Sequence, residues 1–190
     1  VSLDTWGKQA EYIRDGLDFN KAMNNVHDFL DKVPEDGFVI FIVTFNILSL
    51  PNVKKLLENV LELQAKYNGR SGYNKVFFDT PMLRFPQWQS LQLAPESFWH
   101  YADDCLEWMN ENQYDKETLI GFKNHQIDRF RRSVDWMKQD MDKKILEESK
   151  ENFYRFFSEY DKRRGINFLE TFPEFTDFWN ECREYYDRNR

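Results

Sequence analysis

The sequence predicts an α/β fold in its first half and a helical fold in its second half. Short apolar runs alternate with longer amphipathic segments up to residue 92, as in a sheet or barrel built from alternating strands and helices. Three apolar runs start near residues 1, 38 and 76, a spacing of roughly 37 residues that suits successive strand–helix units joined by right-handed crossovers. After residue 92, apolar residues recur only at the spacing of amphipathic helices. We therefore divide the chain into residues 1–92 and 93–190.

The composition excludes several classes of protein. The 190 residues include 18 phenylalanines, 9 tyrosines and 6 tryptophans, which is ample apolar surface for a packed core. The net charge of -7 argues against broad nucleic-acid binding, which requires an excess of lysine and arginine. No run approaches the ~18 apolar residues of a membrane span, and no signal-peptide pattern is visible. We expect a soluble, cytoplasmic protein with no membrane or nucleic-acid partner.

The first strand–helix unit is predicted between residues 1 and 37. Residues 1–5 form a short apolar run that ends in polar side chains. Apolar residues recur at helical spacing from Phe19 to Leu30, and a Pro- and Gly-containing turn at residues 33–37 closes the unit.

Two further strands follow. Residues 38–43 form a continuous β-branched and aromatic run, which is typical of a parallel strand covered on both faces. Ser49 is expected to be the N-cap of the next helix, with Pro51 in its first turn and its end near residues 68–69. Residues 76–78 form the third strand.

The second half is predicted to be helical. One helix starts after Pro95, a second carries apolar residues from Ile127 to Ile145, and two more cover residues 153–163 and 173–186, with Gly165 between them. The many aromatic residues near the carboxyl end favour packing or an interface over a ligand cage.

Polar side chains follow each predicted strand, and they are the candidate ligand-binding residues. The carboxyl ends of parallel strands meet at one edge of a sheet, where ligands bind. The polar residues at the three ends are Ser2 and Asp4, then Thr44 and Asn46, then Asp79 and Thr80.

The sequence contains no motif for phosphate binding, metal binding or a disulfide framework. The glycines are scattered singly and form no phosphate-binding loop. His27, His100 and His125 stand far apart and lack a second ligand at metal spacing, so no metal site is predicted. Cys105 and Cys182 are too few for a disulfide framework or a four-thiolate site, and each is expected to be a small buried side chain.

Residues 1–92 resemble part of the radical S-adenosylmethionine enzymes. The segment from Val1 to Gly7, the turn from Glu11 to Gly16 and the helix that begins near Phe19 are similar to the fourth-strand region of that family. The strand end Thr44-Phe45-Asn46 and the helix after it are similar to the fifth unit. The sequence as a whole is similar to the twitch-type members of this family, which carry an accessory region after the barrel.

The resemblance implies a partial (β/α)6 barrel, of which this chain would supply about three βα units before a helical accessory region. It implies a [4Fe–4S] cluster and S-adenosylmethionine as cofactors of the complete protein. Ser2 and Asp4 would face the cofactor from the fourth strand, and Thr44 and Asn46 from the fifth. Arg14 would meet the methionine carboxylate through a charge-assisted contact. Asp79, on the sixth strand, matches only in its apolar-then-polar pattern.

The chain departs from the family in its cysteines. The family's C-x-x-x-C-x-x-C loop, which binds the cluster, has no counterpart here. Cys105 and Cys182 could at most contribute to an accessory cluster completed by other residues. We therefore expect a fragment that binds cofactor and is inactive alone, whose partner is the missing amino-terminal half of the barrel and whose substrate the sequence does not identify.

Two other functions stay open. The chain could be a complete, non-catalytic α/β-helical module that binds a partner protein through its aromatic helices. It could also be an enzyme of another barrel family that uses Asp4 and Asp79 as acid and base, which requires both carboxylates in one pocket.

Overall fold

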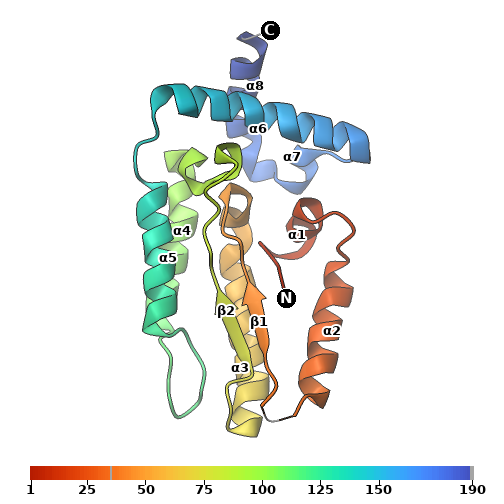
Figure 1. Ribbon diagram of the computed structural model, residues 1–190, viewed down its shortest axis with the longest axis vertical. Coiled ribbons are helices and arrows are strands. Elements are labelled where there is room, and N and C mark those ends of the chain that lie inside the picture. The colour runs from red at the N-terminus through yellow and green to blue at the C-terminus, as the bar shows by residue number, and fades with distance from the viewer. Residues whose placement is uncertain (35, 189–190) are drawn as a thin grey trace.

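The chain folds into a mostly helical structure around one pair of parallel strands (Figure 1). The computed structural model describes residues 1–34 and 36–188, without the side chains of residues 69–71. Its α-helices and strands, with their bounds, are α1 (Gly7–Ile13), α2 (Phe19–Lys32), β1 (Val39–Ile42), α3 (Val53–Ser71), β2 (Val76–Asp79), α4 (Trp99–Glu111), α5 (Asn124–Met137), α6 (Lys143–Arg164), α7 (Phe168–Thr171) and α8 (Thr176–Arg188). Its 3-10 helices are η1 (Ile47–Asn52), η2 (Gln87–Gln89), η3 (Leu91–Leu93), η4 (Glu96–Phe98) and η5 (Pro173–Phe175).

The predicted partial barrel of three strand–helix units is wrong. The sheet has two strands, paired in parallel from Val39 opposite Val76 to Ile42 opposite Asp79. The segment at residues 1–5, predicted as a third strand, contributes one isolated parallel bridge between Ser2 and Ile42. The reason is local: the backbone bends over residues 4–6 and enters α1 at residue 7, so the segment leaves the ladder after one bridge.

Most elements of the first half lie where the sequence predicts them. Asp18 caps α2, because its carboxylate accepts a hydrogen bond of 2.9 Å from the Lys21 N–H. Asn46 replaces the predicted Ser49 as an N-cap, since it begins η1, and Pro51 lies inside that helix. The predicted turn at residues 33–37 includes Glu35, which lies outside the described residues.

The second half differs from the prediction in the helix expected from Ile127 to Ile145 and in the unpredicted short helix α7. The apolar spacing from Ile127 to Ile145 spans two helices, α5 and α6, with a break after Met137. Asp142 starts α6 by accepting hydrogen bonds from the Lys144 and Ile145 N–H groups. Gly165, with φ of +64°, ends α6 in the left-handed conformation that glycine adopts readily.

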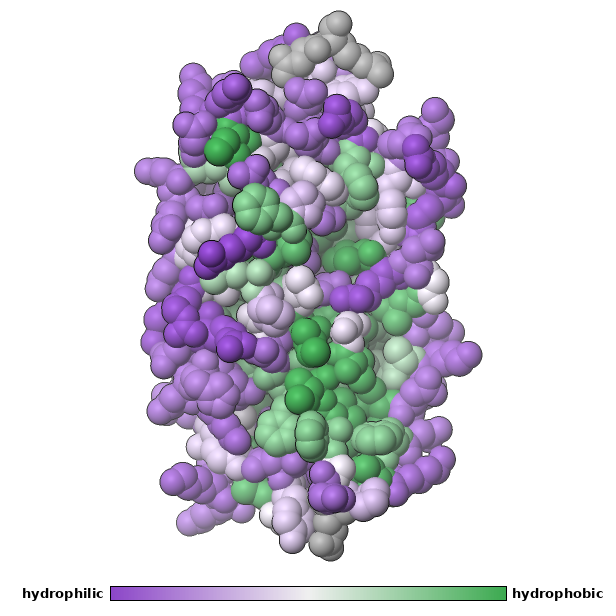
Figure 2. Space-filling view, in the orientation of Figure 1, coloured by the Kyte–Doolittle hydropathy of each residue, from purple (hydrophilic) through white to green (hydrophobic). Residues whose placement is uncertain are grey.

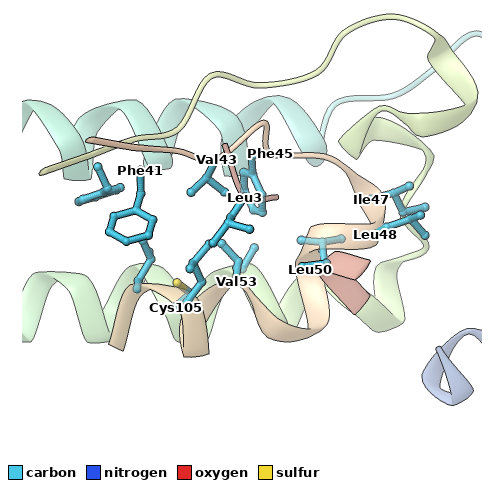
Figure 3. Packing of buried hydrophobic residues seen from close by; sticks show 14 of the residues in the cluster. Leu3, Phe41, Val43, Phe45, Ile47, Leu48, Leu50, Val53 and Cys105 are labelled. Carbon is cyan, nitrogen blue, oxygen red and sulfur yellow. The ribbon is translucent and has the colours of Figure 1, made fainter. Parts of the chain in front are cut away.

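The core lies behind the strands, between them and α3 and α4. Figure 3 shows Leu3, Phe41 and Val53 pointing toward one another there, with the Cys105 sulfur beside them. Residues of both halves belong to this one cluster. Phe45 stacks on Phe130 of α5 with ring centroids 4.8 Å apart. The boundary at residue 92 stays a prediction.

The opposite face of β1 is open. Ile40 is 38 % exposed and Ile42 is 42 % exposed, and Phe38 and Phe29 are exposed beside them. Figure 2 shows apolar residues gathered over this part of the molecule, next to α2. The expectation of a strand covered on both faces is therefore wrong, because the continuous apolar run of β1 buries only every second side chain.

Among residues 1–34 and 36–188, no helix combines the length and the apolar composition needed to cross a bilayer.

Replacing Phe130 with alanine should lower the free energy of unfolding by about 3–5 kcal/mol, because it removes a fully buried ring and leaves a cavity against Phe45. Urea denaturation followed by circular dichroism measures the loss. The matched control is Phe29→Ala on α2, where the ring is 47 % exposed and the cost should stay below about 1 kcal/mol. Equal costs at the two positions would contradict this account of the core.

Candidate ligand-binding site

Four of the seven predicted site residues line one pocket at the carboxyl end of β1. Asp4, Arg14, Thr44 and Asn46 surround a cavity of about 260 Å³. Its remaining wall comes from Ile13, Leu48, Leu83 and Gln89. The four predicted residues, which are up to 42 positions apart in sequence, therefore meet at the carboxyl end of β1, as predicted for polar strand ends.

Asp4 and Arg14 form the charged part of the pocket. Arg14 Nη2 donates a hydrogen bond of 3.1 Å to Asp4 Oδ1, and Nε lies 2.9 Å from Oδ2 as an ion pair outside hydrogen-bonding geometry. The Thr44 N–H donates to the same Asp4 Oδ1 at 3.2 Å. The Asp4 side chain is 6 % exposed and the Arg14 side chain is 36 % exposed. Asp4 thus orients a guanidinium whose Nη1 makes no hydrogen bond with a described residue.

Thr44 and Asn46 play different parts. Asn46 Oδ1 accepts a hydrogen bond of 2.9 Å from the Leu48 N–H, and Nδ2 donates at 2.8 Å to the Thr44 carbonyl. These bonds start η1 and fix the wall of the pocket, so Asn46 acts mainly as a structural residue. The Thr44 hydroxyl is half-buried and forms no hydrogen bond within residues 1–34 and 36–188, which leaves it available to a ligand.

Ser2, Asp79 and the buried Thr80 do not join this group. Ser2 is exposed at its bridge to Ile42 and does not line the pocket. Asp79 forms an ion pair with Arg129 of α5, and it too lies outside the pocket. The structure therefore does not place Asp4 and Asp79 together, as an acid–base pair of carboxylates would require.

The pocket also contains residues that the sequence did not single out. Leu83 follows β2 and Gln89 ends η2, where neither periodicity nor a motif marks them. Arg131 does pair locally, with Asp128 at 3.0 Å, whereas Arg129 reaches across to Asp79.

The two cysteines are buried in separate helices, as expected. Cys105 lies in α4 and Cys182 in α8, both fully buried. Burial raises the pKa of the Cys105 thiol to about 12 and also raises the pKa of Cys182. Within the described part of the chain, no three His, Cys, Asp or Glu residues are grouped for a metal ion. Because a [4Fe–4S] cluster takes cysteine thiolates, the donor set of this chain does not fit one.

Both thiols should therefore resist a disulfide reagent at pH 8 in the native protein. With the pKa of Cys105 near 12, only about one of its thiols in ten thousand is ionised at that pH, and burial further excludes the reagent. Absorbance of the released thiol should show two reactive cysteines in denaturant and slow reaction without it. Fast modification of either cysteine in the folded chain would contradict their burial.

Replacing Asp4 with asparagine should lower the free energy of unfolding by about 1–3 kcal/mol, because the buried partner of Arg14 and the charged acceptor of the Thr44 N–H are lost. Urea denaturation measures the change. The control Asp128→Asn breaks only an exposed ion pair with Arg131, and it should lower the free energy of unfolding by less than about 1 kcal/mol. A larger loss in the control would argue against a structural role for Asp4.

Comparison of the chain with protein-family models, with curated proteins and with solved structures found no match.

Proposed function

We propose that the pocket at the end of β1 binds S-adenosylmethionine by its amino-acid end. The observation that carries the proposal is the Asp4–Arg14 pair, because it presents a partly exposed guanidinium in a fixed orientation. The free Nη1 group can donate to the α-carboxylate of the ligand.

The charge of the pocket suits a zwitterion. Asp4 and Arg14 offer one charge of each sign within 3 Å of each other, and the Thr44 hydroxyl adds a neutral acceptor. An α-amino acid also carries one charge of each sign, so its carboxylate faces Arg14 while its ammonium faces Asp4 and Thr44. A simple anion would bind with less electrostatic stabilisation, because Asp4 already neutralises the charge of the guanidinium.

The size of the pocket sets how the ligand lies. A volume of about 260 Å³ holds the methionyl part, since pockets that enclose a complete drug-sized ligand measure roughly 300–1,000 Å³. The adenosyl part extends onto the open face of β1, where Ile42 and Ile40 precede Thr44 on the same side of the strand. Covering these side chains with adenine would remove apolar surface from water.

The proposed role of this chain is to bind the cofactor. Bound to a cluster, S-adenosylmethionine supplies a 5′-deoxyadenosyl radical, but the cysteines here do not provide the thiolates for that cluster. We therefore assign no radical step to these residues. The exposed apolar residues at the amino end of β1, among them Phe38 and Phe29, favour a protein-interaction module as the second candidate function.

Isothermal titration with two ligands tests the proposal. S-adenosylmethionine should bind about 10-fold more tightly than decarboxylated S-adenosylmethionine, because only the first has a carboxylate for Arg14. Arg14→Gln should weaken binding of the first about 10-fold and leave the second unchanged. Arg131→Gln, which removes an exposed ion pair on α5, is the matched control.

Circular dichroism of each variant verifies that it is folded. Equal affinities for the two ligands in the native chain, or no binding of either, would reject the proposal and leave the interaction module as the better candidate.

A further inference from the structure

A second hollow lies between η2 and the outer face of α6. It has a volume of about 430 Å³, and its helical wall is formed by residues spaced three or four apart along α6. The contributing residues of α6 are Asn152, Arg155, Phe156, Glu159, Tyr160 and Arg163. Trp88 of η2 closes the other side, while its neighbour Gln89 lines the first pocket. We call this hollow the aromatic groove.

The floor of the aromatic groove consists of three rings. Trp88 and Phe156 lie with centroids 4.3 Å apart, and Tyr160 stacks on Phe156 at 5.8 Å with an interplanar angle of 21°. Phe156 is 42 % exposed, although α6 buries Phe153 and Phe157 on its other side. The core of α6 therefore does not use the exposed part of this ring, which is accessible to a planar ligand.

The charges of the groove differ from those of the whole chain. Arg155 donates to the neutral Asn152 side chain, and no acidic residue in the described chain forms an ion pair with it. Arg163 does pair with Glu159, at 2.8 Å. The two arginines and one glutamate leave one positive charge in the groove, on a chain whose net charge is -7. Such a local excess attracts an anion to a fixed place.

We propose that the aromatic groove binds a nucleoside monophosphate, with the base on the rings of Phe156 and Trp88 and the phosphate at Arg155. The volume is within the range of small-ligand sites, roughly 300–1,000 Å³. Asn152 and Glu159 offer an amide and a carboxylate to the edge of the base. A free nucleotide fits better than a nucleic-acid strand, because the acidic chain repels a polyanion beyond the groove.

Titration with AMP, adenosine and inorganic phosphate, followed by calorimetry, tests this site on the full chain. AMP should bind about 10-fold more tightly than adenosine, and phosphate alone should bind more weakly than either. Arg155→Gln should lower the affinity for AMP to that for adenosine and leave adenosine binding unchanged. Phe156→Ala should weaken both nucleoside ligands about 10-fold, since both stack on the ring.

Three control variants separate this groove from other surfaces. Arg188→Gln removes an exposed arginine of α8, and Phe29→Ala removes an exposed ring of α2; neither should alter AMP binding. Arg14→Gln should also leave AMP binding unchanged, so that failure here is distinguishable from failure of the first pocket. AMP binding that resists Arg155→Gln and Phe156→Ala would overturn the proposal, as would no binding. Binding of a ten-nucleotide oligoadenylate 10-fold tighter than AMP would overturn the choice of a free nucleotide.

Discussion

A pair of short parallel strands is not stable by itself in water, and the rest of this structure depends on the helices that stabilise the pair. Two strands have too few hydrogen bonds and too little shared surface for independent stability. Here α3 packs against β2, and α5 adds Phe130 against Phe45. Phe78 of β2 also packs edge-on against Phe122 at 5.3 Å. The helical second half therefore forms part of the core that keeps the strands in place.

The sequence predicted elements well and their assembly poorly. The runs that correspond to α2, β1 and β2 have strong local signals, namely helical periodicity and β-branched or aromatic clusters between turn residues. The number of ladder residues in a strand is set by tertiary contacts. The spacing of three apolar runs therefore suggested three strands where the structure has two and one bridge. Apolar spacing also continued across the break after Met137, because Met141 and Ile145 keep the period of α5 although the helix ends.

The candidate site shows the same division. Polarity after the predicted strands located Asp4, Thr44 and Asn46, because the ends of parallel segments meet whether or not each segment forms a full strand. Arg14 came from a family resemblance, and the structure places it against Asp4. What the sequence could not show is which partner each polar group takes. Asp79 pairs with an arginine 50 positions away, and the amide of Asn46 is used by the backbone of η1.

The open face of β1 connects the fold to the site. Alternate side chains of an extended segment point to the same side, so Ile40, Ile42 and Thr44 form one row that passes from apolar to polar and ends at the Asp4–Arg14 pair. Apolar surface left in water is unfavourable by roughly 25 cal/mol for each Å². Ile40 and Ile42 retain such exposed surface, because no other part of the described chain covers them fully. A ligand with a zwitterionic end and a flat aromatic base would match the order of this row, because its charged end would meet the ion pair while the face of its base covered the isoleucines. The incomplete cover of the sheet and the charge pair at its end therefore favour the same kind of ligand.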